Sequence, residues 1–353
     1  MVAQDIVRKI AKTSLSGLLH AGGAFRLARR LNRHRLLVLT YHGVMQSTDG
    51  PDAWLNRNMV DTATFRWQMQ YLAKTSTCMT LGQAVARLRH GTPLPSNSVV
   101  VTFDDGFKNN YTQAFPVLIE CGVPATIFLT TDHIGRGMHP LWTERVARLI
   151  SGLKRPVVRL ELADETRLWW IRSAVEREQA ASAILKLLKR LPVALRDDKI
   201  AELVSQADGE EPPTQPERYE FLNWDDVRTM AAAGIEFGSH TVHHPVLSTL
   251  DPRQRLEEVV NSKETIEREL RQPCRTFSYP NGGVGDFGDT DRRVLRQVGY
   301  AGAATQIPGF NNLATDPFAL RRINIGRGHT RLVFTAQLSG LWQQIKAAHD
   351  AAA

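Results

Sequence analysis

Short apolar runs alternate with segments of helical periodicity along most of the chain. Six runs have the length and composition of buried strands, at 36–40, 99–103, 125–130, 235–238, 276–279 and 320–325. Apolar positions at helical spacing lie between them, at 65–74, 81–89, 110–120, 224–233, 253–270 and 292–297. This alternation predicts an α/β fold built from βα units, with a mostly parallel sheet that is either open or closed into a barrel.

The alternation is interrupted at about 140–220. An alternating apolar and polar stretch at 158–162 is followed by apolar residues at helical spacing over 184–191, and then by a polar loop at 208–213. We interpret this region as a helical insertion after the strand at 125–130. Insertions at strand ends can form the wall of a substrate groove.

The positive charge of the chain is concentrated at its N-terminus. The 353 residues carry a formal net charge of +8, and residues 1–35 hold eight arginines and lysines against one aspartate. The rest of the chain is nearly neutral, which argues against nucleic acid as a partner and gives no sign of a strongly anionic polymer as substrate. We divide the chain into a basic N-terminal arm at 1–35, a main α/β domain at 36–335 that contains the insertion, and a C-terminal helix or tail at 336–353.

The basic arm has weak amphipathic character, because Ile6 and Ile10 lie four residues apart and Leu15, Leu18 and Leu19 continue at helical spacing. The favoured interpretation is a helix packed on the domain with its basic face in water. Peripheral contact with an anionic membrane surface is the alternative. No stretch approaches the ~20 apolar residues of a membrane span. We expect a cytoplasmic protein, at the inner membrane face if the arm binds lipid, in preference to a secreted or periplasmic one.

Two adjacent carboxylates follow the predicted strand at 99–103. These residues are Asp104 and Asp105, and Gly106 comes directly after them. Neighbouring side chains on an extended strand point to opposite faces, but at a junction with a loop the backbone can turn so that both reach one pocket. One carboxylate can then bind a divalent cation while the other takes a proton from water. The alternative is an ordinary Asp-Asp-Gly turn.

Two histidines follow the predicted strand at 235–238. His240 and His244 are four residues apart, so one helical turn ending at Pro245 would place both imidazoles on the same side. His243 lies off that side and is expected to face solvent or to lie behind the ligands. One carboxylate and two imidazoles make an open metal site, for which zinc is the favoured ion and cobalt, nickel or manganese are alternatives.

These two sets of residues resemble the motifs of the polysaccharide deacetylases, carbohydrate esterase family 4, also described as the nodulation-type chitooligosaccharide deacetylase homology domain. The match consists of Thr-Phe-Asp-Asp-Gly at 102–106 and His-Thr-x-x-His-Pro at 240–245. Phe-Ser-Tyr-Pro-Asn-Gly at 277–282 resembles the third motif of the family. The resemblance covers about residues 36–330, and it implies a distorted (β/α) barrel that removes N-acetyl groups from sugars.

The resemblance also implies roles for individual residues. Asp104 matches the general base, and the metal ligands are Asp105, His240 and His244. The backbone N–H of Asn281 matches a donor to the oxyanion that forms in the reaction.

Further residues are expected to contact the substrate. Tyr279 and Pro280 would shape the wall next to Asn281. Trp224 is one of several tryptophans near the motifs that can stack on a sugar ring, although such residues belong more often to the core.

The chain departs from the usual family pattern at several positions, among them the tyrosine after the proline of the third motif, which is Asn281 here. The arginine that braces the base in the third motif is Ser278 here, and the usual C-terminal motif that contains a histidine is not recognisable. Arg322 is a candidate for the brace. His42 is a candidate for the general acid, because the first strand ends in Tyr-His as in one subgroup of the family, and His329 is its rival.

The sequence therefore predicts a metal-dependent hydrolase that removes N-acetyl groups from amino-sugar units of a poly- or oligosaccharide, or of a glycolipid or exopolysaccharide precursor. Its partner would be an N-acetylated saccharide, and no oligomeric state is predicted. The altered motifs leave two alternatives: an amidohydrolase acting on a non-sugar amide, and a carbohydrate-binding protein with a degenerate site.

Overall fold

The computed structural model describes residues 23–50, 52–137, 139–162, 165–207, 209 and 216–341. Most of the basic arm and nearly all of the polar loop predicted at 208–213 therefore lie outside the described residues. The predicted contact between the arm and a membrane falls mainly on that part of the chain. Among the described residues, no helix is long and apolar enough to cross a membrane.

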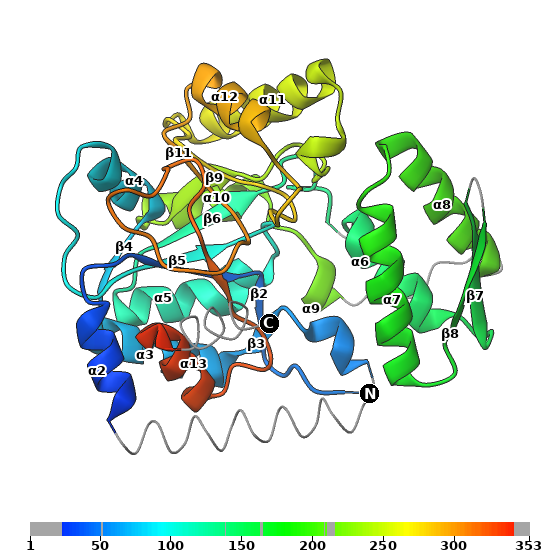
Figure 1. The fold of residues 1–353 in the computed structure, drawn as a ribbon, viewed down its shortest axis with the longest axis horizontal. Coiled ribbons are helices and arrows are strands. Elements are labelled where there is room, and N and C mark those ends of the chain that lie inside the picture. The colour runs from blue at the N-terminus through cyan, green and yellow to red at the C-terminus, as the bar shows by residue number, and fades with distance from the viewer. Residues whose placement is uncertain are drawn as a thin grey trace, which may run out of the picture.

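A parallel sheet occupies the centre of the molecule and curls into a half-barrel (Figure 1). Within the described residues its strand order is β11-β10-β9-β6-β5-β1-β12, and β4 pairs with the first half of β5. The strands are β1 (Leu37–Tyr41), β4 (Thr77–Met79), β5 (Ser98–Phe103), β6 (Ala125–Leu129), β9 (Glu236–Ser239), β10 (Thr276–Ser278), β11 (Gly302–Ala304) and β12 (Ile323–Asn324). The fold class predicted from the sequence, a distorted (β/α) barrel, is confirmed.

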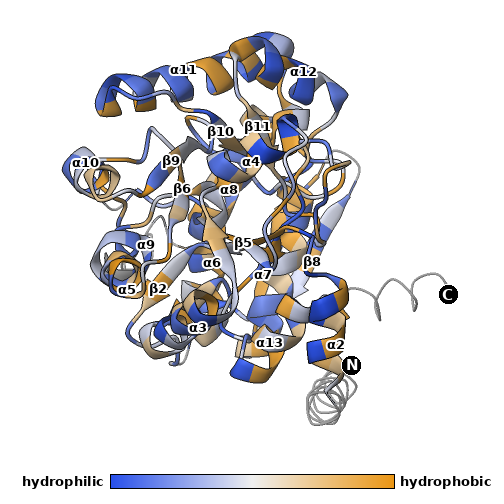
Figure 2. Ribbon diagram, turned by 90° about the vertical axis from the view of Figure 1, so that its left-hand side faces the viewer, coloured by the Kyte–Doolittle hydropathy of each residue, from blue (hydrophilic) through white to orange (hydrophobic). Residues whose placement is uncertain are grey.

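Helices connect most of these strands and cover the outside of the sheet. They are α3 (Thr62–Thr75), α4 (Leu81–Arg89), α5 (Phe115–Cys121), α10 (Trp224–Ala232), α11 (Pro252–Leu270) and α12 (Asp289–Val298). The helix predicted at 110–120 begins with a π-helical turn, Asn110–Ala114, before α5. Figure 2 shows hydrophilic and hydrophobic residues interspersed along α11 and α12, as expected for helices with one buried face.

The two faces of each strand belong to different environments. Leu39, Val101 and Ile127 lie in the large core that also contains residues of α3, whereas Val38 and Val100 pack with residues of α4. Because side chains alternate along a strand, the face of Val38 and Val100 also carries buried polar residues near the carboxyl ends of the strands. These are Thr40, Thr102, Ser278 and Arg322. The carboxyl ends of the strands thus carry buried polar side chains, while the rest of the sheet is packed with apolar ones.

The region predicted to be an insertion forms a unit with its own apolar core beside the sheet, drawn in green in Figure 1. Helices α6 and α7 pack together, and β7 and β8 form an antiparallel hairpin. Its elements are α6 (Trp142–Gly152), β7 (Val157–Glu161), β8 (Thr166–Trp170), α7 (Ala174–Leu188) and α8 (Val193–Gln206). Helix α9 (Pro216–Tyr219) follows and contacts β2. Short elements on the same side of the sheet are β2 (Gly43–Met45), β3 (Met59–Asp61) and the 3₁₀ turn η1 (Ala53–Asn56).

The described ends of the chain pack against each other. Helix α2 (Ala24–Leu31) lies on α13 (Arg331–Ser339), and Arg29 donates a hydrogen bond of 2.6 Å to the carbonyl of Thr75. Phe334 and Leu338 of α13 are buried in the large core. The domain boundary predicted at residue 336 therefore falls inside a helix that belongs to the domain. The part of the basic arm that the structure describes is a helix packed on the body.

We predict that Gly238→Ala destabilises the fold. A Cβ at Gly238 would lie 2.6 Å from Cε1 of Phe128 and 2.7 Å from Oγ1 of Thr276. Overpacking of this kind lowers the free energy of unfolding by about 1–3 kcal/mol, measurable by urea unfolding. Gly328→Ala is the matched control, because a Cβ there meets nothing within 4 Å. Equal stability of the two variants would contradict the close packing at β9.

Candidate metal centre and active site

Asp104 and Asp105 reach one cavity because the backbone turns directly after β5. Asp105 and Gly106 have φ angles of 75° and 87°, in the left-handed region. Asp104 lies just beyond the end of β5, but its N–H donates to the carbonyl of Tyr41 in β1 at 3.0 Å, in continuation of the hydrogen bonds between the two strands. The carbonyl of Asp105 accepts a hydrogen bond from the N–H of Thr130. The predicted turn is therefore present, and both carboxylates line the cavity.

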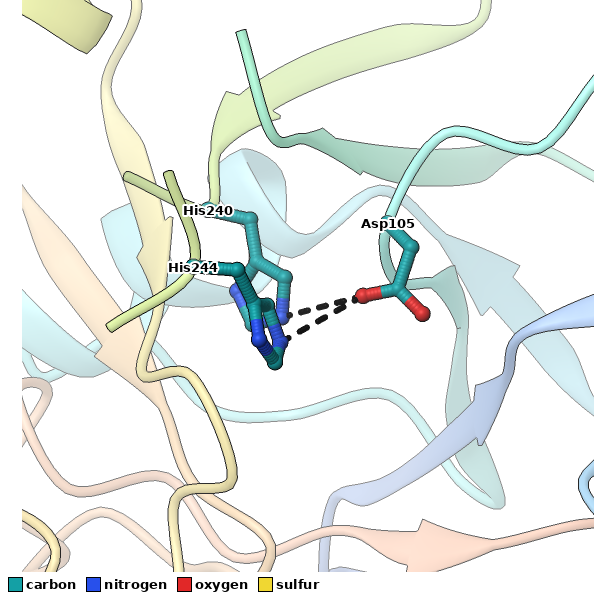
Figure 3. Close-up of side chains that lie close together, drawn as sticks. All are labelled: Asp105, His240 and His244. Atoms are coloured by element: carbon teal, nitrogen blue, oxygen red, sulfur yellow. Dashed lines mark ion pairs between the residues drawn. The ribbon is translucent and has the colours of Figure 1, made fainter. Parts of the chain in front are cut away.

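Asp105, His240 and His244 form a buried cluster at the carboxyl ends of β5 and β9 (Figure 3). Oδ1 of Asp105 lies 3.5 Å from Nε2 of His240 and 3.6 Å from Nε2 of His244. One ligand atom from each residue lies within 4.8 Å of the other two. Figure 3 shows the carboxylate facing the two imidazoles across a gap that a single ion could bridge.

The histidine ligands lie on an irregular loop, so the predicted helical turn is wrong. Thr241 and His244 have φ angles of 70° and 58°, which an α-helix does not allow. The N–H groups of Val242 and His243 donate to the carboxylate of Glu258 at 2.8 and 3.0 Å instead of to carbonyl groups of a helix. The two imidazoles still converge, because the loop doubles back on itself. His243 is largely exposed and also contacts Glu258.

The protonation states in this cluster fit a divalent cation. Burial lowers the pKa of His240 and, to a greater extent, that of His244. Both imidazoles are therefore neutral near pH 7, which is the form that binds metals. Nδ1 of His240 contacts the carbonyl of Ser278 at 2.7 Å, which directs Nε2 toward Asp105. Burial and the charge of Asp104 raise the pKa of Asp105 well above its ordinary value, and its Oδ1 has no hydrogen-bond partner among the described residues. A cation bound here would supply both the missing partner and the compensating charge.

Asp104 is held by a fully buried arginine. Nη1 and Nη2 of Arg322 donate to its two carboxylate oxygens at 2.8 and 2.7 Å, and Nε2 of Gln306 donates to Oδ2 at 3.0 Å. Burial alone would raise the pKa of Asp104, but the guanidinium group of Arg322, together with His240 and His42, outweighs it and holds that pKa well below the ordinary value. The predicted contact between Arg322 and Asp104 is thus present. Ser278 accepts a hydrogen bond from the same guanidinium at 2.8 Å.

The two candidates for the general acid occupy different places. His42 follows β1 and lines the cavity, and burial lowers its pKa to about 4. Its Nδ1 has no hydrogen-bond partner among the described residues. His329 does not line the cavity as the structure describes it, and its Nδ1 contacts Gly326 within its own turn. The geometry favours His42.

Asn281 also lines the cavity, but its two predicted neighbours do not. Asn281 has a φ angle of 60°, and its side-chain nitrogen is buried without a partner among the described residues. Tyr279 is fully buried: its ring stacks on Phe287, and its hydroxyl donates to the carbonyl of Phe318. Pro280 is buried beside it. Both residues therefore support the wall from behind, and their contact with substrate stays a prediction.

The contact of Trp224 with substrate also stays a prediction, which the position of this residue does not favour. Trp224 is the first residue of α10, packs against the large core and is absent from the described lining of the cavity. Trp142 of the insertion occupies the wall instead, and its Nε1 donates to the carbonyl of His244 at 3.2 Å. An aromatic residue close to a motif in sequence need not be close to it in space.

The insertion forms one wall of the cavity, which has a volume of about 480 Å³. Residues of α6 and α7 line this wall, opposite the strand ends of the sheet. The sequence did not indicate a role for two supporting residues, Gln306, which contacts Asp104, and Glu258, which contacts the histidine loop. Neither belongs to a recognisable motif. The position of Gln306 shortly after β11 is the one signal that could have indicated it.

We predict that Arg322→Gln lowers the free energy of unfolding by about 3–5 kcal/mol at neutral pH, because it leaves a buried carboxylate without its counter-ion. In the unmodified protein the folded-state pKa of Asp104 is depressed, so its contribution is present at neutral pH and lost below about pH 4. In the variant that pKa is raised, and the difference in stability between the two proteins should shrink as the pH falls.

Urea unfolding at several pH values measures this effect. The double variant Asp104→Asn with Arg322→Gln is the control, since it removes both charges and should regain part of the lost stability. A loss that is the same at every pH would show that the ion pair is not its cause.

Comparisons with known proteins agree with this geometry. The family described as polysaccharide deacetylase matches residues 91–303. The poly-beta-1,6-N-acetyl-D-glucosamine N-deacetylase of Staphylococcus epidermidis is 26% identical over 260 residues, which cover 69% of this chain and 84% of the relative. YxkH of Bacillus subtilis, whose name includes the words polysaccharide deacetylase, is 21% identical over 308 residues, which cover 87% of this chain and 77% of that protein.

A solved structure shares the fold. Streptococcus pyogenes deacetylase PplD, determined in complex with acetate, superimposes with a TM-score of 0.55 at 18% sequence identity, covering 88% of this chain and 98% of that one. The family match covers β5, β6, β9 and β10 of the half-barrel. It also covers Asp105, His240 and His244. The chain belongs to the polysaccharide deacetylase family.

Proposed function

We propose that this protein removes N-acetyl groups from amino-sugar units of a saccharide in a metal-dependent reaction. The observation that carries the proposal is the pairing of a three-residue metal cluster with a separate, ionised carboxylate in one cavity. Asp105, His240 and His244 would hold the cation, for which zinc fits the donor set best and cobalt, nickel or manganese also fit. When bound, the cation polarises the acetamide carbonyl of the substrate.

Asp104 acts as the general base. It takes a proton from the water that attacks the acetamide carbon, and the contact with Arg322 keeps it ionised until that moment. Gln306 fixes the orientation of the carboxylate through Oδ2. The N–H of Asn281, which lies on the opposite wall and has no protein acceptor among the described residues, stabilises the oxyanion.

His42 protonates the departing sugar amine. Its pKa of about 4 makes the imidazole neutral in the free protein at neutral pH. Negative charge that develops on the attacked carbonyl favours the protonated imidazole. His42 then takes up a proton from solvent and gives it to the nitrogen as the C–N bond breaks, and the proton that Asp104 took from water returns to solvent. Acetate and a free amino sugar are the products. No step requires a covalent intermediate with the protein.

The relatives support an amino-sugar substrate. One of them is named for the removal of acetyl groups from poly-beta-1,6-N-acetyl-D-glucosamine. The contact between Arg322 and Asp104 also supports an active enzyme over a degenerate binding protein, because a guanidinium just before β12 takes the place of the missing arginine of the third motif. We place the reaction in the cytoplasm or at the inner membrane face, as the basic arm suggests.

We predict that Asp104→Asn abolishes acetate release from N-acetylglucosamine oligomers while the metal remains bound. Loss of the base should lower kcat by about 10²–10⁴-fold. Asp105→Asn is the companion variant, and it should lose both activity and metal, measured by elemental analysis. Chelation should inactivate the native protein and added zinc should restore it. Activity that survives complete metal removal would refute the proposal.

We predict that His42→Ala lowers kcat with little change in KM, whereas His329→Ala keeps most of the activity. The reason is that His42 lines the cavity and His329 does not. Steady-state kinetics on an acetylated oligomer, and on an activated ester that needs no protonated leaving group, would separate the two. If His42→Ala impaired the ester as strongly as the amide, a role as general acid would be wrong.

A further inference from the structure

Two cationic side chains line the cavity without a role in the proposed reaction. Arg57 and Lys186 both belong to its lining, and both are exposed. Neither has an acidic partner among the described residues, although most exposed arginines of the insertion do. The two side chains therefore present positive charge that the described protein leaves uncompensated.

The two cations lie on elements that pack together. Arg57 directly follows η1, and η1 contacts α7, the helix that carries Lys186. Trp54 of η1 packs against the apolar core of the insertion, as does Leu185, the residue before Lys186. This packing brings both cations to the wall where the insertion meets the sheet domain. Arg57 is also close enough to His42 for its charge to lower the pKa of that imidazole.

The other charged groups of the cavity already have partners. Asp104 is paired with Arg322, and Asp105 belongs to the metal cluster. Lys189 forms an ion pair of 2.9 Å with Asp286. Glu144 lies close to the guanidinium groups of two buried arginines, Arg148 and Arg218. Arg57 and Lys186 thus give this wall a local positive charge, in contrast with the nearly neutral body of the chain.

A third donor lies at the same wall. The indole Nε1 of Trp54 is buried and has no hydrogen-bond acceptor among the described residues, although Trp54 lines the cavity. Arginine, lysine and tryptophan side chains offer donors and no acceptor. A wall of three such groups favours a ligand rich in acceptor atoms, and the two charges favour an anion.

We propose that Arg57 and Lys186 bind an anionic substituent of the saccharide, a carboxylate or a phosphate, next to the acetamide that is cleaved. This inference rests on the proposed function, since it specifies the substrate class of the same site. The guanidinium of Arg57 can contact either anion through two parallel hydrogen bonds, and Lys186 adds a second charge from α7. The wall formed by η1 and α7 then selects the substrate while the sheet supplies the reacting groups.

The experiment compares three acetylated oligomers of equal length: a neutral N-acetylglucosamine oligomer, one that alternates with a uronic acid, and one that carries a phosphate ester. We expect kcat/KM to be at least tenfold higher for one of the anionic oligomers, and the identity of that oligomer distinguishes a carboxylate from a phosphate. The preference should fall as salt is raised.

Arg57→Gln and Lys186→Gln test the residues themselves. Each should reduce the preference for the anionic oligomer about tenfold, mainly through KM. Lys154→Gln is the matched control, because Lys154 is an exposed cation near α6 that does not line the cavity as described. It should leave the preference unchanged. A native protein that favours the neutral oligomer, or two variants that lose activity equally on all oligomers, would overturn the inference.

A binding measurement separates this inference from the proposed function. Oligomers that carry the anion but no acetyl group cannot be deacetylated, so calorimetry reports the subsite alone. Binding that weakens about tenfold in Arg57→Gln and Lys186→Gln, and not in Lys154→Gln, would support the subsite even if no oligomer were turned over. Turnover of acetylated oligomers together with equal binding by all four proteins would support the reaction and refute the subsite.

Discussion

The buried ion pair between Asp104 and Arg322 is the interaction on which the arrangement of the site depends. Both side chains are almost completely excluded from water, where an unpaired charge would be destabilising by several kcal/mol. The guanidinium group also donates to the carbonyl of Thr305 and to Oγ1 of Thr102. One cation therefore joins the end of β5 and the start of β12 to the loop after β11. It fixes the carboxylate in a single orientation and keeps it ionised, which is what a general base beside a metal requires.

The same pair explains how the chain departs from its family and still completes the site. Ser278 stands where the resemblance places a bracing arginine, and its small side chain leaves room for the guanidinium of Arg322, which it contacts. The sheet curls so that Ala304 bridges to Leu320, and this brings the chain before β12 next to β11. Residues on the inner face at the carboxyl ends of a curled sheet converge. A charge needed at that point can therefore come from more than one strand.

Much of this architecture could be predicted from the sequence, because it follows from periodicity and from the rule that sites lie at strand ends. The six strands, the insertion and the convergence of Asp105 with the two histidines belong to this class. The errors share a different cause. The left-handed φ angles of Thr241 and His244 are stabilised by Glu258, a residue on a later helix, and spacing alone cannot reveal that contact. The packing of Trp224 against the large core depends in the same way on the position of α10, which distance in sequence does not reveal.

The insertion makes direct hydrogen bonds and an ion pair with the loops that carry the candidate active-site residues. Nε1 of Trp142 donates to the carbonyl of His244. Nζ of Lys189 forms an ion pair with Asp286. The carboxylate of Asp286 also accepts a hydrogen bond from the N–H of Gly283, on the loop that carries Asn281. The insertion is thus anchored both to the loop that carries His244 and to the loop that carries Asn281. Because it has an apolar core of its own, it can keep a fixed shape between these anchors. A substrate that contacts the insertion wall is therefore held in a defined position relative to the metal cluster and the base.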